Sequence, residues 1–168
     1  MALYYFDASA LVKYYILEPG STWVRGLVEA LASNGRSRAN TIFISEASIT
    51  ESAAAFAVLH RTQRLSRQAR DGAFRVCMKQ IAIGLFGTVR VITADFQMAA
   101  HLTQRHPLKA YDAVQLAVAL RHSLILAAYK LTVTFVSGDN TLVTAAQAEG
   151  LRTDNPFEHI LPQEGGKT

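Results

Sequence analysis

The chain has few of the residues that build disulfide scaffolds or soft-metal sites. Its 168 residues include one cysteine, Cys77, so no internal disulfide is possible. We expect this thiol to be buried as a small apolar group. The five histidines show neither HxxxH nor HxH spacing. A zinc centre is therefore not expected.

Long apolar runs and the common phosphate-binding loops are also missing. Polar or charged residues interrupt the longest runs well short of the ~20 apolar residues that a membrane span needs. The first apolar run stops at Asp7 and no basic region precedes it, which argues against a signal peptide. No GxxxxGK[ST], GxGxxG or GxSxG pattern is present. We expect a cytoplasmic protein with no membrane partner.

The composition is that of a folded, mildly basic domain. Half of the residues are hydrophobic and 18% are charged, so most of the chain should fold. Its length favours a single domain, which we place at residues 1–161, followed by a flexible tail at 162–168. The net charge of +4 favours acidic partners such as nucleic acid.

Strand-like and helix-like segments alternate along the chain. Strands are predicted near 3–6, 41–44, 88–92 and 131–136. Helices are predicted from Ser9 to about Glu18, and over about 22–32, 47–59, 66–83, 95–105, 110–126 and 140–149. Such alternation predicts an α/β fold: a three-layer α/β/α domain with a mostly parallel central sheet.

Four carboxylates stand where an ionised group is costly. Asp7 and Asp139 directly follow predicted strands, and Glu51 and Asp112 are the charged residues of two apolar helical stretches. Parallel strands place ligands at their carboxyl ends, and converging carboxylates repel one another unless a cation lies between them. This pattern predicts a site for a hard divalent metal.

Each acid also has a structural explanation. Asp7 or Asp139 could cap the helix that follows, and Asp112 could lie in the first turn of its helix. Glu51 could form an ion pair with Arg90 or Arg121. Asp95 is interpreted as an acid at a helix start rather than a metal ligand.

Small polar groups stand close to three of these acids. Ser9 follows Asp7 by two residues, and Ser137 precedes Asp139 by two. Gln115 lies one turn after Asp112, so we expect it to support that carboxylate. The two serine hydroxyls are predicted to orient a ligand or a metal-bound water.

Four segments together resemble PIN-domain proteins, in particular the VapC toxin ribonucleases of type II toxin–antitoxin systems. They are Tyr5-Phe6-Asp7-Ala8-Ser9-Ala10-Leu11-Val12-Lys13, Ile49-Thr50-Glu51, Ala110-Tyr111-Asp112-Ala113-Val114-Gln115-Leu116-Ala117 and Phe135-Val136-Ser137-Gly138-Asp139. The resemblance spans about residues 3–157. The sequence departs from it at Tyr111, where many relatives carry a smaller or more aliphatic residue, and in the alanine-rich helix of Glu51.

The resemblance implies a Mg²⁺- or Mn²⁺-dependent endoribonuclease in which Asp7, Glu51, Asp112 and Asp139 hold the metal and activate water. It also implies a homodimer and a cognate antitoxin protein that covers the active-site groove. Separately, a run of basic residues between 61 and 79 fits a solvated helix face, contacts with RNA phosphates or docking of an acidic partner. For contacts with RNA, the candidates are Arg61, Arg64, Arg67 and Arg70.

Three other functions compete with this interpretation. A phosphoacceptor signalling domain would need adjacent acids after the first strand and an aspartate ending the third, where the chain has Ile92-Thr93. A dehalogenase-like phosphatase would need an aspartate at Ser9. A non-catalytic RNA-binding scaffold is disfavoured by the intact acids.

The first two predicted helices carry many large apolar side chains. These are Leu11, Val12, Tyr14, Tyr15, Trp23, Val24, Leu27 and Val28. One stripe facing the sheet does not require so many, so we expect another chain to cover part of this surface. An antitoxin helix or the twin subunit would fit there.

Overall fold

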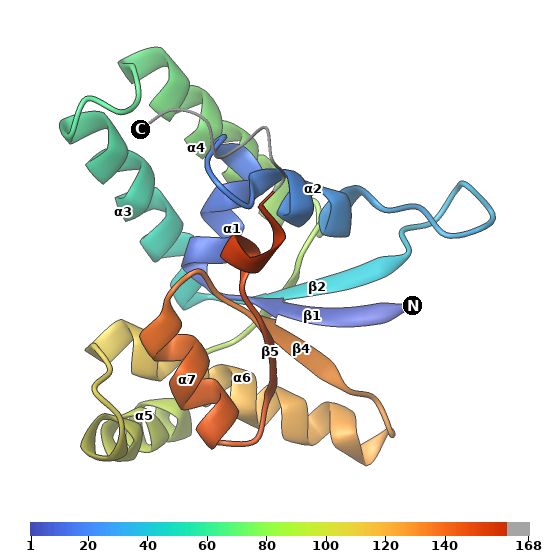
Figure 1. Cartoon of the computed structure of the whole chain (residues 1–168), viewed down its shortest axis with the longest axis vertical. Coiled ribbons are helices and arrows are strands. Elements are labelled where there is room, and N and C mark those ends of the chain that lie inside the picture. Colours follow the sequence, from blue (N-terminus) through green and yellow to red (C-terminus); the bar gives the residue numbers. More distant parts are fainter. Residues whose placement is uncertain (161–168) are drawn as a thin grey trace.

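A computed structural model describes residues 1–160, in which helices cover both faces of a central sheet (Figure 1). The elements are β1 (Ala2–Phe6), α1 (Ala8–Tyr15), α2 (Ser21–Glu29), β2 (Asn40–Ser45), α3 (Ala47–Arg61), α4 (Arg67–Ala82), β3 (Gly87–Val89), α5 (Thr93–Arg105), α6 (Ala110–Ala128), β4 (Val133–Val136), α7 (Asn140–Ala148), β5 (Arg152–Asp154) and the 3₁₀ turn η1 (Pro156–His159). The predicted flexible tail, 162–168, lies outside the described residues.

The sheet has five parallel strands in the order β3-β2-β1-β4-β5. The central strand β1 lies between β2 and β4, with Tyr5 opposite both Phe43 and Phe135. The predicted three-layer α/β/α fold with a mostly parallel sheet is therefore confirmed. Because β1 and β4 are parallel neighbours, with Phe6 opposite Val136, their carboxyl ends lie next to each other.

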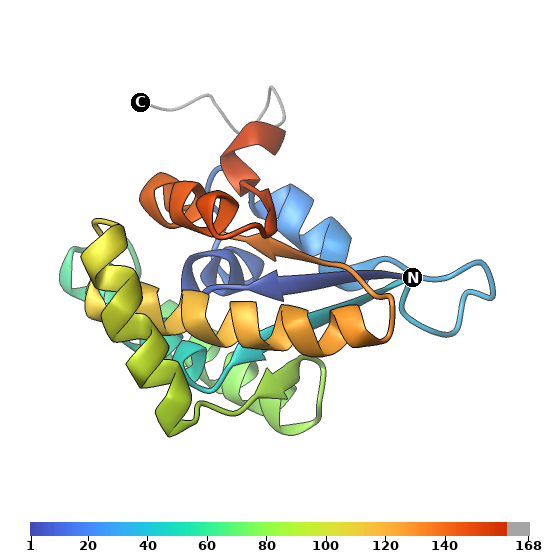
Figure 2. The same cartoon turned by 90° about the horizontal axis from the view of Figure 1, so that it is seen from below.

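Alternation along β1 divides the core into two layers. Leu3 and Tyr5 pack with α5, α6 and α7, whereas Phe6 packs on the opposite face with α1 and α2. Figure 1 shows α1 and α2 above the sheet and α5, α6 and α7 below it, and Figure 2, turned by 90°, shows the yellow-orange helix α6 lying across the strands. A third cluster forms where α3 and α4 pack against α1, and it contains the buried free thiol Cys77 as predicted.

Several element boundaries differ from those predicted. The first helix ends at Tyr15, before the Pro19-Gly20 pair, because the chain needs residues 16–20 to turn into α2. Ser66 caps α4 as expected, accepting a hydrogen bond from the amide of Ala69 at 3.1 Å. The short elements β5 and η1 were not predicted, since three or four residues carry no periodic signal. Within residues 1–160 no helix has the length and apolar character to cross a membrane.

The large apolar residues of α1 and α2 are mostly used inside the chain itself. Leu11, Val12, Val24 and Val28 are buried. Trp23 stacks on His159 of η1, with ring centroids 4.1 Å apart and planes 5° apart. The expectation that these helices present a surplus of apolar groups is thus wrong for the four buried side chains, because the sheet covers Leu11, Val24 and Val28, and α3 with α4 covers Val12. Trp23 is partly covered by η1.

Candidate functional site

Asp7 lies in the turn between β1 and α1 and is 5% exposed. As the cap of α1 it accepts a hydrogen bond from the amide of Ala10 at 2.8 Å. The hydroxyls of Ser9 and Ser137 also donate to its carboxylate, each at 2.8 Å. Burial nevertheless raises the pKa of Asp7 to about 6, because these donors do not fully replace the water that solvates an exposed carboxylate.

Asp139 occupies the equivalent place after β4. Its carboxylate caps α7 by accepting from the amides of Thr141 at 2.8 Å and Leu142 at 3.1 Å. The hydroxyl of Ser137 accepts from the amide of Asp139, and that of Ser9 accepts from the amide of Gly138. The two serines therefore join the β1–α1 and β4–α7 turns, which fixes both aspartates at one edge of the sheet.

Glu51 lies on α3 and is held by Gln115 of α6. The amide nitrogen of Gln115 donates to the Glu51 carboxylate and, at 2.8 Å, to the Ser48 hydroxyl. The Ser45 hydroxyl donates to the Gln115 oxygen at 2.9 Å. Gln115 was expected to support Asp112, but its side chain is buried toward α3 and β2 and bonds Glu51 instead.

Asp112 lies in the first turn of α6, as its structural explanation proposed. Burial raises its pKa, and the negative charge of Asp139 raises it further. Burial likewise raises the pKa of Glu51, with additional contributions from Asp7 and Asp112. The charge of Asp112 also raises the pKa of Asp7, so mutual repulsion links neighbouring carboxylates across the site.

All four carboxylates line one cavity of about 540 Å³, together with Ser9 and Gln115. Within residues 1–160, however, no three His, Cys, Asp or Glu side chains are close enough to ligate a single ion directly. The donor set still suits Mg²⁺ or Mn²⁺, which prefer oxygen and commonly bind one or two carboxylates while keeping several waters.

A family model described as PIN domain matches residues 4–132. The chain belongs to the PIN domain family. PIN domains are generally nucleases, and such nucleases generally use divalent metals. The residues that follow Thr132, including Ser137 and Asp139, lie outside the matched segment.

Two solved structures resemble this PIN domain. The crystal structure of PAE2754 from Pyrobaculum aerophilum is 16% identical with a TM-score of 0.56, covering 99% of this chain and 91% of that one. A toxin-antitoxin complex from Klebsiella pneumoniae is also 16% identical, with a TM-score of 0.49, covering 94% of this chain and 98% of that one. At 16% identity, the likeness to the Pyrobaculum aerophilum structure shows the fold alone. Among curated proteins no match was found.

Lys13 and Phe157 also line the cavity, and neither was among the predicted site residues. Lys13 on α1 is 3% exposed, and its ammonium donates to Glu18 and to the carbonyl of Pro19, both at 2.9 Å. A lysine inside the apolar segment 8–15 was a usable signal, by the same argument that selected Glu51. Phe157 lines the cavity from η1, and a lone aromatic near the end of a chain gives no comparable signal.

The four candidate RNA-binding arginines do not line the acidic cavity. They lie at the end of α3, in the following loop and at the start of α4. Arg64 is 3.6 Å from the carboxylate of Glu18, which also pairs with Lys13. Arg67 and Arg70 both pair with Asp71.

Asp95 stands apart from the site in this PIN domain. It is 1% exposed, accepts from the Ile92 amide at the start of α5, and pairs with Arg121 at 2.7 Å. Its interpretation as a helix-start acid is confirmed. The proposed ion pair of Glu51 with Arg90 or Arg121 is wrong, because Arg121 binds Asp95 and Arg90 lies 3.9 Å from Glu46.

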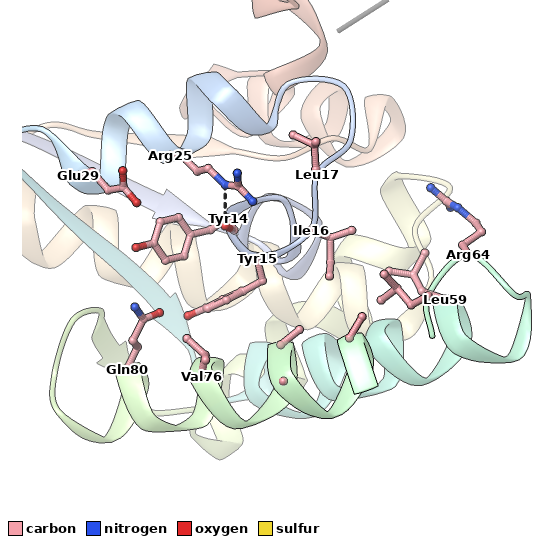
Figure 3. A pocket seen from close by; sticks show the side chains of 14 residues that line it. Tyr14, Tyr15, Ile16, Leu17, Arg25, Glu29, Leu59, Arg64, Val76 and Gln80 are labelled. Carbon is pink, nitrogen blue, oxygen red and sulfur yellow. Dashed lines mark hydrogen bonds between the residues drawn. The ribbon is translucent and has the colours of Figure 1, made fainter. Parts of the chain in front are cut away.

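A larger cavity, of about 900 Å³, lies beside the acidic one. Figure 3 shows Tyr14, Tyr15 and Ile16 of the α1 end facing Val76 and Gln80 of α4 across it. Arg25 of α2 closes one side and donates to the carbonyl of Tyr14 at 3.1 Å. This cavity contains none of the four acids.

Proposed function

We propose that this PIN domain is a metal-dependent endoribonuclease that cleaves RNA phosphodiester bonds with an activated water. One observation carries the proposal: Asp7, Glu51, Asp112 and Asp139 come from four separate segments yet line one cavity at the carboxyl edge of the parallel sheet. Within this proposal, residues 1–161 form the single functional domain.

The four carboxylates are assigned to the site of the metal, Mg²⁺ or Mn²⁺: one or two would bind the ion directly and the others would hold its waters. When bound, such an ion lowers the pKa of a coordinated water and stabilises the charge on a phosphate. The chain itself supplies orientation. Ser9 and Ser137 fix the Asp7 carboxylate, and Gln115 fixes that of Glu51, so neither group has to reorganise when the substrate enters.

Contacts with the RNA backbone are assigned to Arg61, Arg64, Arg67 and Arg70. Of these, Arg64 is 62% and Arg67 is 83% exposed, so their guanidinium groups are accessible to a phosphate. Their ion pairs with Glu18 and Asp71 are long or solvent-exposed, and such pairs contribute little that RNA could not replace.

The motif resemblance also supports a toxin role in the cytoplasm, with a homodimer silenced by an antitoxin. The larger cavity between α1, α2 and α4 is suited to an apolar helix laid in a groove.

Co-expression with the product of the adjacent gene should yield a stable complex without nuclease activity. The isolated chain should have a mass near twice 18.4 kDa. A monomer that binds no such product would contradict the dimer and antitoxin assignments.

The enzymatic proposal is tested by incubating purified protein with labelled RNA in EDTA, Mg²⁺ or Mn²⁺. We expect cleavage only with a divalent ion. Glu51→Gln and Asp112→Asn should each reduce the rate at least ~100-fold, because each removes one charge from the metal site at nearly constant volume. Cleavage that persists in EDTA, or in both variants, would contradict the assignment.

A non-catalytic RNA-binding scaffold is the second candidate. It is favoured by the spacing of the carboxylates, since no three within residues 1–160 converge on one point. The scaffold predicts RNA binding that divalent ions leave unchanged and no cleavage with any metal.

A further inference from the structure

Phe157 stands at the wall of the acidic cavity with much of its ring open to solvent. It shares the cavity with Asp7, Asp112 and Asp139, and 45% of the residue is exposed. A large apolar side chain is usually covered when the fold allows it. Here the exposed ring borders four carboxylates.

The environment of the ring determines which part of it is open. The ammonium of Lys13 lies 4.0 Å from the ring centroid and covers one face. The edge is placed against Gly138, where an added Cβ would lie 3.2 Å from Cε2 of Phe157. Because Lys13 covers one face and Gly138 lies at the edge, a flat ligand would meet the ring on its opposite face.

The turn that carries this ring is in contact with the rest of the chain at both of its ends. Gly20 approaches Pro156 so closely that an added Cβ would lie 2.5 Å from the Pro156 carbonyl oxygen. Trp23 stacks on His159 at the other end of the turn. Figure 1 shows η1 as the dark red turn beside α1 and α2.

Asn155 connects the same turn to the catalytic edge. It is 5% exposed, its side-chain oxygen accepts from the Phe157 amide at 3.0 Å, and its nitrogen donates to Asn140 at 2.7 Å. Asn140 directly follows Asp139. These hydrogen bonds hold the turn, and therefore the ring of Phe157, in a defined position relative to Asp139.

We propose that Phe157 is a stacking site for a nucleobase of single-stranded RNA next to the cleaved phosphate. The inference rests on the proposed ribonuclease function and deepens it. An unpaired base presents a flat π-face, which aromatic rings bind with little preference for sequence. Lys13 holds the ring from behind by a cation–π contact, which leaves one face for the base.

Variants at this position separate stacking from simple packing. Phe157→Leu keeps an apolar group against Lys13 and Gly138 but removes the π-face, whereas Phe157→Tyr keeps it. We expect Phe157→Leu to weaken binding of a 2′-O-methyl RNA decamer about ten-fold and to raise the KM for RNA cleavage, with Phe157→Tyr near wild type. Replacing single bases of the decamer by abasic sites should remove the same increment from the wild type but not from Phe157→Leu.

A fluorescence experiment reports stacking without requiring cleavage. In a Trp23→Phe background, Phe157→Trp places the single tryptophan at the site, and we expect the decamer to quench it. Phe96→Trp in the same background is the matched control, because Phe96 is 58% exposed on α5 and lies outside the acidic cavity. It should not be quenched.

The outcomes distinguish this inference from the proposed function. Cleavage by the wild type with unchanged binding and KM in Phe157→Leu would overturn the stacking site and leave the ribonuclease intact. Quenching at position 157 in a protein that cleaves no RNA would support stacking and contradict the ribonuclease. Loss of antitoxin binding in Phe157→Leu with unchanged RNA binding would overturn the inference in favour of a protein contact.

Discussion

At the residue scale, the Asp7 carboxylate is held in place by hydrogen bonds, but its negative charge is costly to bury. Its carboxylate receives an amide and two hydroxyls, but burial still raises its pKa from 3.8 to about 6. In metal-free protein the folded state therefore holds this proton more tightly than the unfolded state. The contribution of Asp7 to stability is fully present below the unfolded pKa and is lost as the pH rises through about 6.

Asp7→Asn should remove this pH dependence. The amide oxygen can still cap α1, and no charge has to be buried. We expect the variant, in EDTA at pH ~7.5, to be more stable than wild type by up to about 3 kcal/mol, the free-energy equivalent of raising the pKa of Asp7 from 3.8 to about 6. This difference in unfolding free energy between variant and wild type should decrease as the pH falls toward about 4, where the wild-type carboxyl is protonated. Urea unfolding across this range measures it, and a gap independent of pH would contradict the assignment to Asp7.

Asp95→Asn should separate stability from catalysis. The substitution leaves Arg121 without its carboxylate partner, so we expect a loss of about 1–3 kcal/mol. Because Asp95 does not line the acidic cavity, RNA cleavage by the folded variant should match the wild type. Chemical unfolding and a cleavage assay at the same temperature test both parts. A variant as inactive as Asp112→Asn would place Asp95 in the catalytic site.

At the element scale, the hairpin of α3 and α4 carries residues of both the proposed metal site and the proposed RNA-binding surface. It carries Glu51 toward the sheet and the arginines toward solvent, and its loop reaches the α1–α2 turn through Arg64 and Glu18. Figure 1 shows this hairpin extending away from the sheet. The same helix pair thus carries one carboxylate of the metal site and the arginines assigned to the RNA backbone.

Neutralising the hairpin should weaken RNA binding without affecting catalysis on bound RNA. Replacing Arg61 and Arg64 by alanine should lower the affinity for RNA of any sequence. It should also reduce the salt dependence of binding by about one unit of slope for each phosphate that an arginine no longer neutralises. Filter binding from about 50 to 200 mM salt measures this slope.

Replacing Arg105 by alanine is the control for this experiment, since Arg105 pairs with Glu149 away from the hairpin. Its slope and affinity should stay at the wild-type values. An unchanged slope in the Arg61 and Arg64 variant would exclude these side chains from the interface.

At the scale of the whole molecule, a bound divalent ion should stabilise the fold. The mutual repulsion of four buried or half-buried carboxylates opposes folding, and an ion that binds only the folded state adds about 2.7 kcal/mol at a hundred-fold excess over its Kd. We therefore expect the melting temperature in millimolar Mn²⁺ to exceed that in EDTA. Asp112→Asn should lose most of the increase. Equal melting temperatures in the two conditions would count against a metal site.

The sequence alone determined the parallel three-layer fold and the candidate acids. Strand and helix periods are local, and an acid such as Glu51 inside an apolar helix is conspicuous without any coordinates. Sequence could likewise place Asp95 at a helix start, because capping depends on adjacent residues. The element boundaries were approximate, and β5 and η1 were missed because they are too short to carry a period.

Tertiary structure alone decided which groups meet. Gln115 bonds Glu51 across 64 positions rather than Asp112 on its own helix, because α6 packs its buried face toward α3. Lys13 and Phe157 share a contact that joins the first helix to the last turn. Spacing along a chain fixes which face of an element a residue occupies, but the neighbour on that face is set by how the elements pack.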